Sequence, residues 1–186
     1  MTNNNKLMFK YLLPLLAFGI LIASGCNKDD DDTGGDPQEL ITTVLLEFSP
    51  AGGTPLTFSF KDVDGIGGNA PVVDNVVLAA NTTYTLRVKF LDESQAGNVE
   101  DITAEVSDES AAHLVCFDTE GSVPLPAVQD VDTDGKPLGL VSQVVTTSAG
   151  TGKLTVSLKH EPDKGAAAPC NTGETDVEVI FDVTIL

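Results

Sequence analysis

The segment Tyr84-Thr85-Leu86-Arg87-Val88-Lys89-Phe90 decides the fold class, because apolar and polar side chains alternate along its whole length. A period of two places all the apolar side chains of a strand on one face, which is typical of a half-buried antiparallel sheet. The alternation recurs in four other segments, at 44–48, 56–61, 153–159 and 177–185. Together these five segments predict an all-β protein.

Weaker segments fill the gaps between these five. Two of them, 72–78 and 140–147, are rich in β-branched residues but alternate poorly, so we expect strands buried on both faces. Shorter candidate strands lie at 113–117 and 126–131. About seven to nine strands within residues 40–186, separated by Gly, Asn and Pro turns, predict one immunoglobulin-like antiparallel β-sandwich. A closed barrel is the alternative architecture.

One segment, 98–112, interrupts the strand pattern. Ile102 and Val106 lie four residues apart, and Asn98 and Asp101 have the spacing of a weak capping box. We therefore expect one short surface helix inserted between two strands.

The N-terminal residues predict that the chain is exported to the cell envelope. Lys6 and Lys10 precede an apolar run at 11–22, which is too short to span about 30 Å of hydrocarbon and contains Pro14. This pattern is typical of a secretory signal at 1–25. The string Ala23-Ser24-Gly25-Cys26 resembles the bacterial lipobox, which implies that Cys26 is lipid-modified and begins the mature chain. An ordinary secretory signal with an incidental cysteine is the alternative.

An acidic segment follows Cys26 and predicts a solvated tether at 26–39, because four consecutive aspartates at 29–32 repel one another. Lys28-Asp29-Asp30 resembles the export signal of Bacteroidota surface lipoproteins. That resemblance implies an outer-membrane protein facing the cell exterior. The alternatives are a plain acidic spacer and a position on the periplasmic face.

The overall charge limits the partners. The 186 residues include 28 acidic and 10 basic side chains, for a net charge of −18. Nucleic acids need clustered Lys and Arg, so we expect no nucleic-acid partner. An anionic membrane surface would also repel the chain. We expect membrane contact through the lipid anchor, and a protein or glycan partner of unknown identity.

Cys116 and Cys170 remain after lipidation of Cys26, and an even pair in an oxidising envelope predicts a disulfide. Two alternatives stay open. The two thiols are free and buried, or they join His113 and His160 in a four-ligand metal site. His160 shares the parity of the apolar residues in 154–158, so it is expected to point toward the edge of the core.

Two acidic loops are weak calcium candidates. Asp130, Asp132 and Asp134 alternate before Gly135, but Val141 stands where an EF-hand needs its bidentate acid, so only a looser oxygen site is possible. Asp62 and Asp64 lie in a second, glycine-rich loop. Simple turns are the favoured explanation of both loops. No other cofactor is expected.

Five strings, spread in order through residues 40–186, resemble a family of uncharacterised Bacteroidota lipoproteins: LITTV (40–44), GTPLTF (53–58), LAANTTY (78–84), LKHEP (158–162) and GETDVEV (173–179). Some members have the label of a type 1 periplasmic binding fold. That label implies a longer, two-lobed α/β chain, which the strand pattern here contradicts.

The sequence contains no recognisable catalytic motif, and we assign no catalytic residue. We therefore expect a non-enzymatic, lipid-anchored surface protein with a binding or structural role. The alternative is a module that binds a small ligand, a carbohydrate or calcium. The absence of Trp makes stacking on a sugar less favourable.

Overall fold

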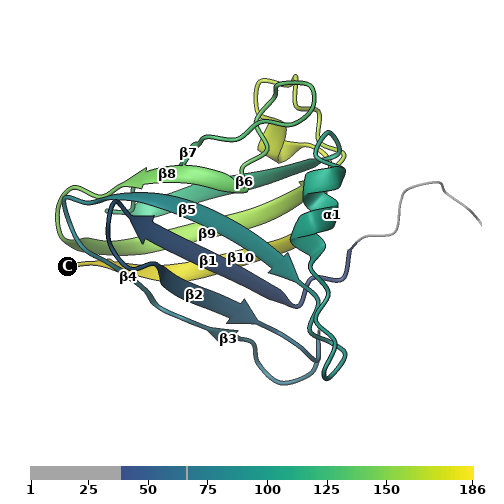
Figure 1. Ribbon diagram of the computed structural model, residues 1–186, viewed down its shortest axis with the longest axis horizontal. Helices are drawn as coiled ribbons and strands as arrows, with labels where there is room; N and C mark the ends of the chain where they lie inside the picture. Colours follow the sequence, from purple (N-terminus) through teal and green to yellow (C-terminus); the bar gives the residue numbers. More distant parts are fainter. Residues whose placement is uncertain (1–38, 66) are drawn as a thin grey trace, which may run out of the picture. The chain divides into compact units, whose positions relative to one another are not determined.

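The computed structural model describes residues 39–65 and 67–186, which form two β-sheets packed face to face (Figure 1). The predicted signal sequence at 1–25, Cys26 and all of the predicted tether except Glu39 lie outside the described residues. The predicted fold class, an all-β sandwich with one short inserted helix, is confirmed.

Sheet A contains six strands, and every neighbouring pair is antiparallel. In spatial order they are β3 (Val72–Val73), β2 (Leu56–Lys61), β1 (Thr43–Pro50), β5 (Thr83–Leu91), β8 (Val141–Val145) and β7 (Ala127–Val128). Sheet B contains four strands. In spatial order they are β4 (Val76–Leu78), β10 (Glu174–Ile185), β9 (Gly150–His160) and β6 (His113–Gly121).

The strand order is that of an immunoglobulin fold. Strands β1-β5-β8-β7 take the places of A-B-E-D, and β6-β9-β10 take those of C-F-G. Strands β2 and β3 extend the A edge, and β4 extends the G edge. The described residues therefore contain ten strands, more than predicted, and β4 runs parallel to β10, which departs from the expected antiparallel sandwich.

The extra strand arises because segment 72–78 is divided between the two sheets. The Asp74 carboxylate accepts hydrogen bonds from the Ser59 backbone N–H (2.7 Å) and hydroxyl (2.8 Å), which fixes the chain to β2 before it crosses to sheet B. The expectation of burial on both faces is wrong for Val72, which is 66% exposed. It is also wrong for β8, where Ser142 and Val144 are buried and their neighbours are not.

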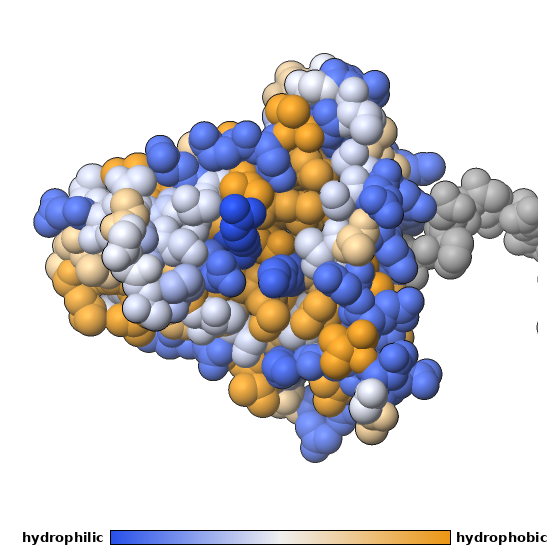
Figure 2. Space-filling view, in the orientation of Figure 1, coloured by the Kyte–Doolittle hydropathy of each residue, from blue (hydrophilic) through white to orange (hydrophobic). Residues whose placement is uncertain are grey.

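Alternating positions of both sheets supply the core. Phe48, Phe90 and Phe181 are fully buried, and the Phe48 ring makes edge-to-face contacts with Phe58 and Tyr84 at centroid distances of 6.1 and 6.0 Å. On the surface of sheet A that faces away from the core, hydrophilic side chains are interspersed with hydrophobic ones (Figure 2). The alternation in the sequence thus separates the core from the solvent side of the sheet.

Helix α1 (Ile102–Asp108) is shorter than the segment that predicted it. Its N-cap is Asp101, whose carboxylate accepts a hydrogen bond from the Thr103 N–H at 3.1 Å, so the expected cap at Asn98 is wrong. Ile102 and Val106 are buried as their spacing predicts. Figure 1 shows α1 at the end of the sandwich where β9 ends and β6 and β10 begin. No helix of the described residues is long and apolar enough to cross a membrane.

Candidate functional site

The two histidines of the chain meet at the end of sheet B. His113 is the first residue of β6 and His160 the last of β9, and the antiparallel register places them directly opposite each other. Their ring centroids are 4.9 Å apart with an interplanar angle of 36°. His113 is completely buried and His160 is 6% exposed, so the expected inward direction of His160 is confirmed.

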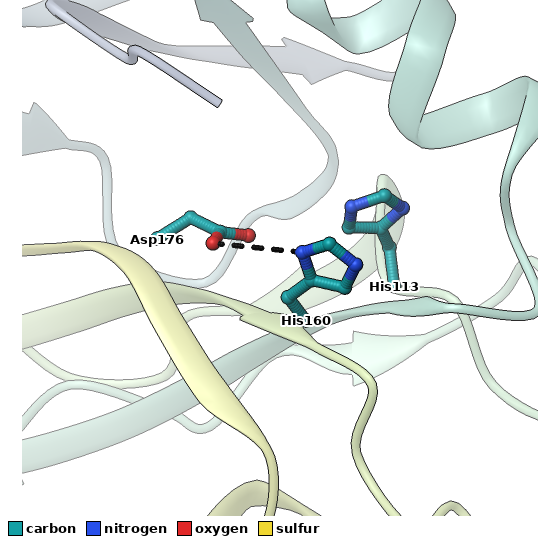
Figure 3. Close-up of side chains that lie close together, drawn as sticks. All are labelled: His113, His160 and Asp176. Atoms are coloured by element: carbon teal, nitrogen blue, oxygen red, sulfur yellow. Dashed lines mark ion pairs between the residues drawn. The ribbon is translucent and has the colours of Figure 1, made fainter. Parts of the chain in front are cut away.

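Asp176 reaches the histidines because of a β-bulge in β10. The register of β10 against β9 shifts between Thr175 and Val177, which leaves Asp176 as the extra residue. The Asp176 side chain is 0% exposed, and its Oδ1 lies 4.0 Å from Nδ1 of His160 (Figure 3). Neither Asp176 oxygen accepts a hydrogen bond from an N–H or hydroxyl group among the described residues, and the side-chain partner of Asp176 is the carboxyl group of Glu39. A buried carboxylate without donors is costly, so it needs an explanation.

Glu39 brings a second carboxylate to the same place from the segment that precedes β1. Its Oε1 lies 3.1 Å from Nε2 of His113, and its side chain is 11% exposed. The other ring nitrogen of His113, Nδ1, lies 3.2 Å from the backbone oxygen of Glu109 at the C-terminus of α1. Because a carbonyl oxygen only accepts, Nδ1 holds the ring proton in neutral His113. Nε2 then presents its lone pair toward Glu39.

We call His113, His160, Asp176 and Glu39 the end cluster. Burial raises the pKa of Asp176, and the nearby Glu39 carboxylate adds to the rise. Burial also raises the pKa of Glu39 against the opposing effect of His160, while burial lowers the pKa of His113. Burial thus disfavours the charged forms of Asp176, Glu39 and His113 unless a compensating charge is present.

The two histidines of the end cluster could be named as candidate ligands from the sequence, but neither acid could. Asp176 has the parity of Glu178, which predicts an outward side chain, and only the bulge reverses this. Glu39 stands in a segment that the sequence assigns to the tether. No signal in a single sequence locates either acid beside His113.

Cys116 and Cys170 form a disulfide, as predicted. The bond joins β6 to a short 3-10 helix (Pro169–Asn171) in the connection between β9 and β10. It differs in position from the B–F disulfide of antibody domains. The alternatives with two free thiols, or with both cysteines as metal ligands beside the histidines, are wrong.

Asp130 and Asp132, proposed as calcium ligands, bind N–H donors. Asp132 accepts hydrogen bonds from the backbone N–H groups of Asp134 (2.9 Å) and Lys136 (2.8 Å), and forms a buried ion pair with Lys164 at 2.8 Å. Burial opposes ionisation, but the Lys164 and backbone donors lower the pKa of Asp132 overall. Asp130 likewise accepts from two backbone N–H groups further along the loop. The arrangement accounts for both carboxylates without calcium.

In the second acidic loop, Asp64 accepts hydrogen bonds from the backbone and side chain of Asn69 at 2.9 and 2.6 Å. These bonds lower the pKa of Asp64. Asp62 has one buried oxygen without a partner among the described residues, and residue 66 of this loop lies outside them. Calcium binding here stays a prediction.

An apolar hollow lies beside the disulfide, between the edges of the two sheets. It encloses about 250 Å³. Its wall consists mainly of apolar side chains, which include Leu114, Phe117, Leu125, Pro126, Val128 and Pro169. Leu125 at this site is 61% exposed. Such a hollow suits an apolar group of a ligand better than a sugar, which needs polar partners and an exposed aromatic ring.

Comparison with known proteins finds no relative: no protein-family model, no curated protein and no solved structure matches the chain.

Proposed function

We propose that the chain is a non-enzymatic lipoprotein of the bacterial cell envelope, related to Bacteroidota surface lipoproteins, whose immunoglobulin-like domain binds a partner at the membrane. The observation that best supports this proposal is the Cys116–Cys170 disulfide, since such bonds persist in oxidising compartments and are rare in the cytosol. The signal-like residues 1–25 and the lipobox-like string ending at Cys26 agree with the same compartment.

The acidic residues after Cys26 favour the outer leaflet of the outer membrane, with the periplasmic face as the alternative. A net charge of −18 keeps the domain away from anionic surfaces, so the lipid at Cys26 is the membrane contact in this proposal. Several acyl chains on one cysteine, at about 0.8 kcal/mol per buried CH₂, are sufficient for stable anchoring.

Replacing Cys26 tests the anchor. Cys26→Ser should move the chain from the membrane fraction to the soluble fraction and abolish incorporation of labelled palmitate. Asn27→Ser, which alters the neighbouring residue and keeps the thiol, should leave both unchanged. Membrane association of Cys26→Ser equal to that of the unaltered chain would refute lipid anchoring.

The side of the outer membrane on which the domain lies needs a separate measurement. Protease added to intact cells should digest the anchored chain if it faces the exterior. Replacing Asp29 and Asp30 by Asn should then protect the chain from protease without releasing it from the membrane. Protection of the unaltered chain would place it on the periplasmic face.

The hollow beside the disulfide favours a small apolar ligand, or an apolar side chain of a partner, over a carbohydrate. Small apolar compounds such as indole and octanol should raise the melting temperature of the chain, because a ligand that binds only the native state stabilises it. Leu125→Asp should abolish the rise. Val131→Asp, at an equally exposed position (61%) outside the hollow, should not. Equal responses of the two variants would exclude the hollow as the binding site.

A further inference from the structure

The end cluster has the donor chemistry of a transition-metal site. One ligand atom each from His113, His160 and Asp176 lies within 4.8 Å of the others, and the same holds for Glu39, Glu109 and His113. Ligands of a tetrahedral Zn²⁺ ion, at about 2.0–2.2 Å from the metal, are about 3.3–3.6 Å from one another. The separations of 3.1 Å between Glu39 and His113 and 4.0 Å between Asp176 and His160 lie on either side of that range.

The side chains also have the orientation that metal ligands need. Figure 3 shows Nδ1 of His160 facing the Asp176 carboxylate, with the His113 ring beside that of His160. Nδ1 of His113 is directed at the backbone oxygen of Glu109, and metal-binding histidines commonly use their second nitrogen for such a bond, which fixes the ring. Nε2 of His113 is then available as a ligand.

The buried acids provide an independent reason for a cation. The Asp176 side chain is fully buried, points into the end cluster and accepts no hydrogen bond from an N–H or hydroxyl group among the residues that the structure describes; its side-chain neighbour is the Glu39 carboxyl group. One oxygen of Glu39 is buried without a hydrogen-bond partner among the described residues, and Nε2 of His113, which makes no hydrogen bond there, faces the other Glu39 oxygen at 3.1 Å. A divalent cation would satisfy these atoms together, and two carboxylates would neutralise its charge in the protein interior.

We propose that His113, His160, Asp176 and Glu39 bind one divalent transition-metal ion, best matched by Zn²⁺. Two imidazole nitrogens with two carboxylate oxygens suit Zn²⁺, Co²⁺ or Ni²⁺, whereas Ca²⁺ and Mg²⁺ prefer oxygen ligands only. His113, His160 and Asp176 form one group of neighbouring ligand atoms, and Glu39, which is grouped with His113, would supply the fourth ligand of a tetrahedral ion, as is typical of a structural site. The ion would connect the segment before β1 to β6, β9 and β10 at one end of the sandwich. This inference does not depend on lipid anchoring.

Zn²⁺ titration of the full-length chain, after treatment with a chelator, tests the proposal. Calorimetry should give one ion per chain, and Zn²⁺ should raise the melting temperature by several degrees. Co²⁺ should give the intense visible absorption of a tetrahedral site. Ca²⁺ in the same range should give neither effect.

Asp176→Asn preserves the shape of the side chain and removes one ligand, so it should lower the Zn²⁺ affinity by about a hundredfold or more. The matched control is Asp182→Asn, an exposed acid on the same strand, which should bind Zn²⁺ like the unaltered chain. If Asp176→Asn does not fold, His160→Gln takes its place, with loss of the Co²⁺ absorption as the readout. The proposal is overturned if the unaltered chain binds no Zn²⁺ or Co²⁺ at one ion per chain, or if the end-cluster variant and Asp182→Asn bind equally.

Discussion

His113 and His160 lie directly opposite each other on β6 and β9, with their ring centroids 4.9 Å apart at the end of sheet B. They are the only histidines of the chain, and two strands, β7 and β8, lie between β6 and β9 in the sequence. The immunoglobulin-like topology brings them together because β6 begins and β9 ends at the same end of sheet B. Without a bound ion, the neighbouring carboxylates of Asp176 and Glu39 at this end of sheet B should lower the free energy of unfolding.

We expect Asp176→Asn to stabilise the metal-free chain at pH 7 by about 1–3 kcal/mol, because it removes a buried carboxylate that no N–H or hydroxyl donor of the described residues satisfies and that lies beside a second acid, Glu39. Burial raises the pKa of Asp176 in the folded state, so folding favours its protonated form and stability falls as the pH rises above its ordinary value of 3.8. The gain should therefore disappear below pH 3.8, where the carboxyl is protonated in both states. Urea unfolding in the presence of a chelator at both pH values measures it. A destabilised variant at pH 7 would show that Asp176 has a partner in solution.

Lys164→Met should destabilise the domain by about 3–5 kcal/mol, because it leaves the buried Asp132 carboxylate without its ion-pair partner. Lys164 also donates a hydrogen bond to the Ser110 backbone oxygen at 2.7 Å. Lys159→Met, in the same part of the chain but exposed, should change stability much less. Urea unfolding at pH 7 compares the two, and equal losses would contradict a structural role for the buried pair.

The pH dependence of the same pair follows from the lowered pKa of Asp132. A depressed folded-state pKa contributes stability that is complete above the ordinary value of 3.8 and is lost as the pH falls through the folded-state value. In Asp132→Asn the free energy of unfolding should therefore fall less steeply as the pH is lowered below 4. If it falls as steeply as in the unaltered chain, other carboxylates cause the acid sensitivity.

Removing the disulfide should cost about 4 kcal/mol in the chain-entropy model, given a sequence separation of 54 between Cys116 and Cys170. The double variant Cys116→Ala/Cys170→Ala should unfold at a lower urea concentration than the oxidised chain. Reducing agent should lower the melting temperature of the unaltered chain but not that of the double variant. A reductant-insensitive melting temperature of the unaltered chain would argue against the bond.

Gly152 in β9 has no room for a side chain, because a methyl group there would overlap the backbone oxygen of Glu120 on β6. Gly152→Ala should separate these strands and prevent folding, as judged by the far-ultraviolet circular dichroism. Gly135→Ala adds its methyl group in open space at a φ of +75°, so it should cost only about 1 kcal/mol of backbone strain. Two folded variants of similar stability would contradict the close approach of β6 and β9.

The strands of the core could be predicted because each one separates apolar from polar side chains within a few residues. Tyr84 to Phe90 alternates in the sequence as it does in the structure, with Leu86, Val88 and Phe90 buried. Segment 72–78 could not be predicted as two strands, because its division depends on the hydrogen bonds that Asp74 accepts from Ser59, 15 residues earlier in the chain. Local alternation does not contain such long-range contacts.

The end cluster depends still more on tertiary structure. The disulfide partners could be proposed from their number alone, since only two cysteines follow Cys26. The inward position of Asp176 could not be predicted from the sequence, because the bulge that turns the side chain inward is a property of the pairing between β9 and β10. A sequence pattern with a period of two assigns it to the solvent.

Mass spectrometry of the chain purified from its native membrane is the decisive measurement of lipid anchoring. We expect the mature protein to begin at Cys26, with a diacylglyceryl group on the thiol of this residue. A mature chain that begins elsewhere, or an N-terminal Cys26 without lipid, would refute lipid anchoring.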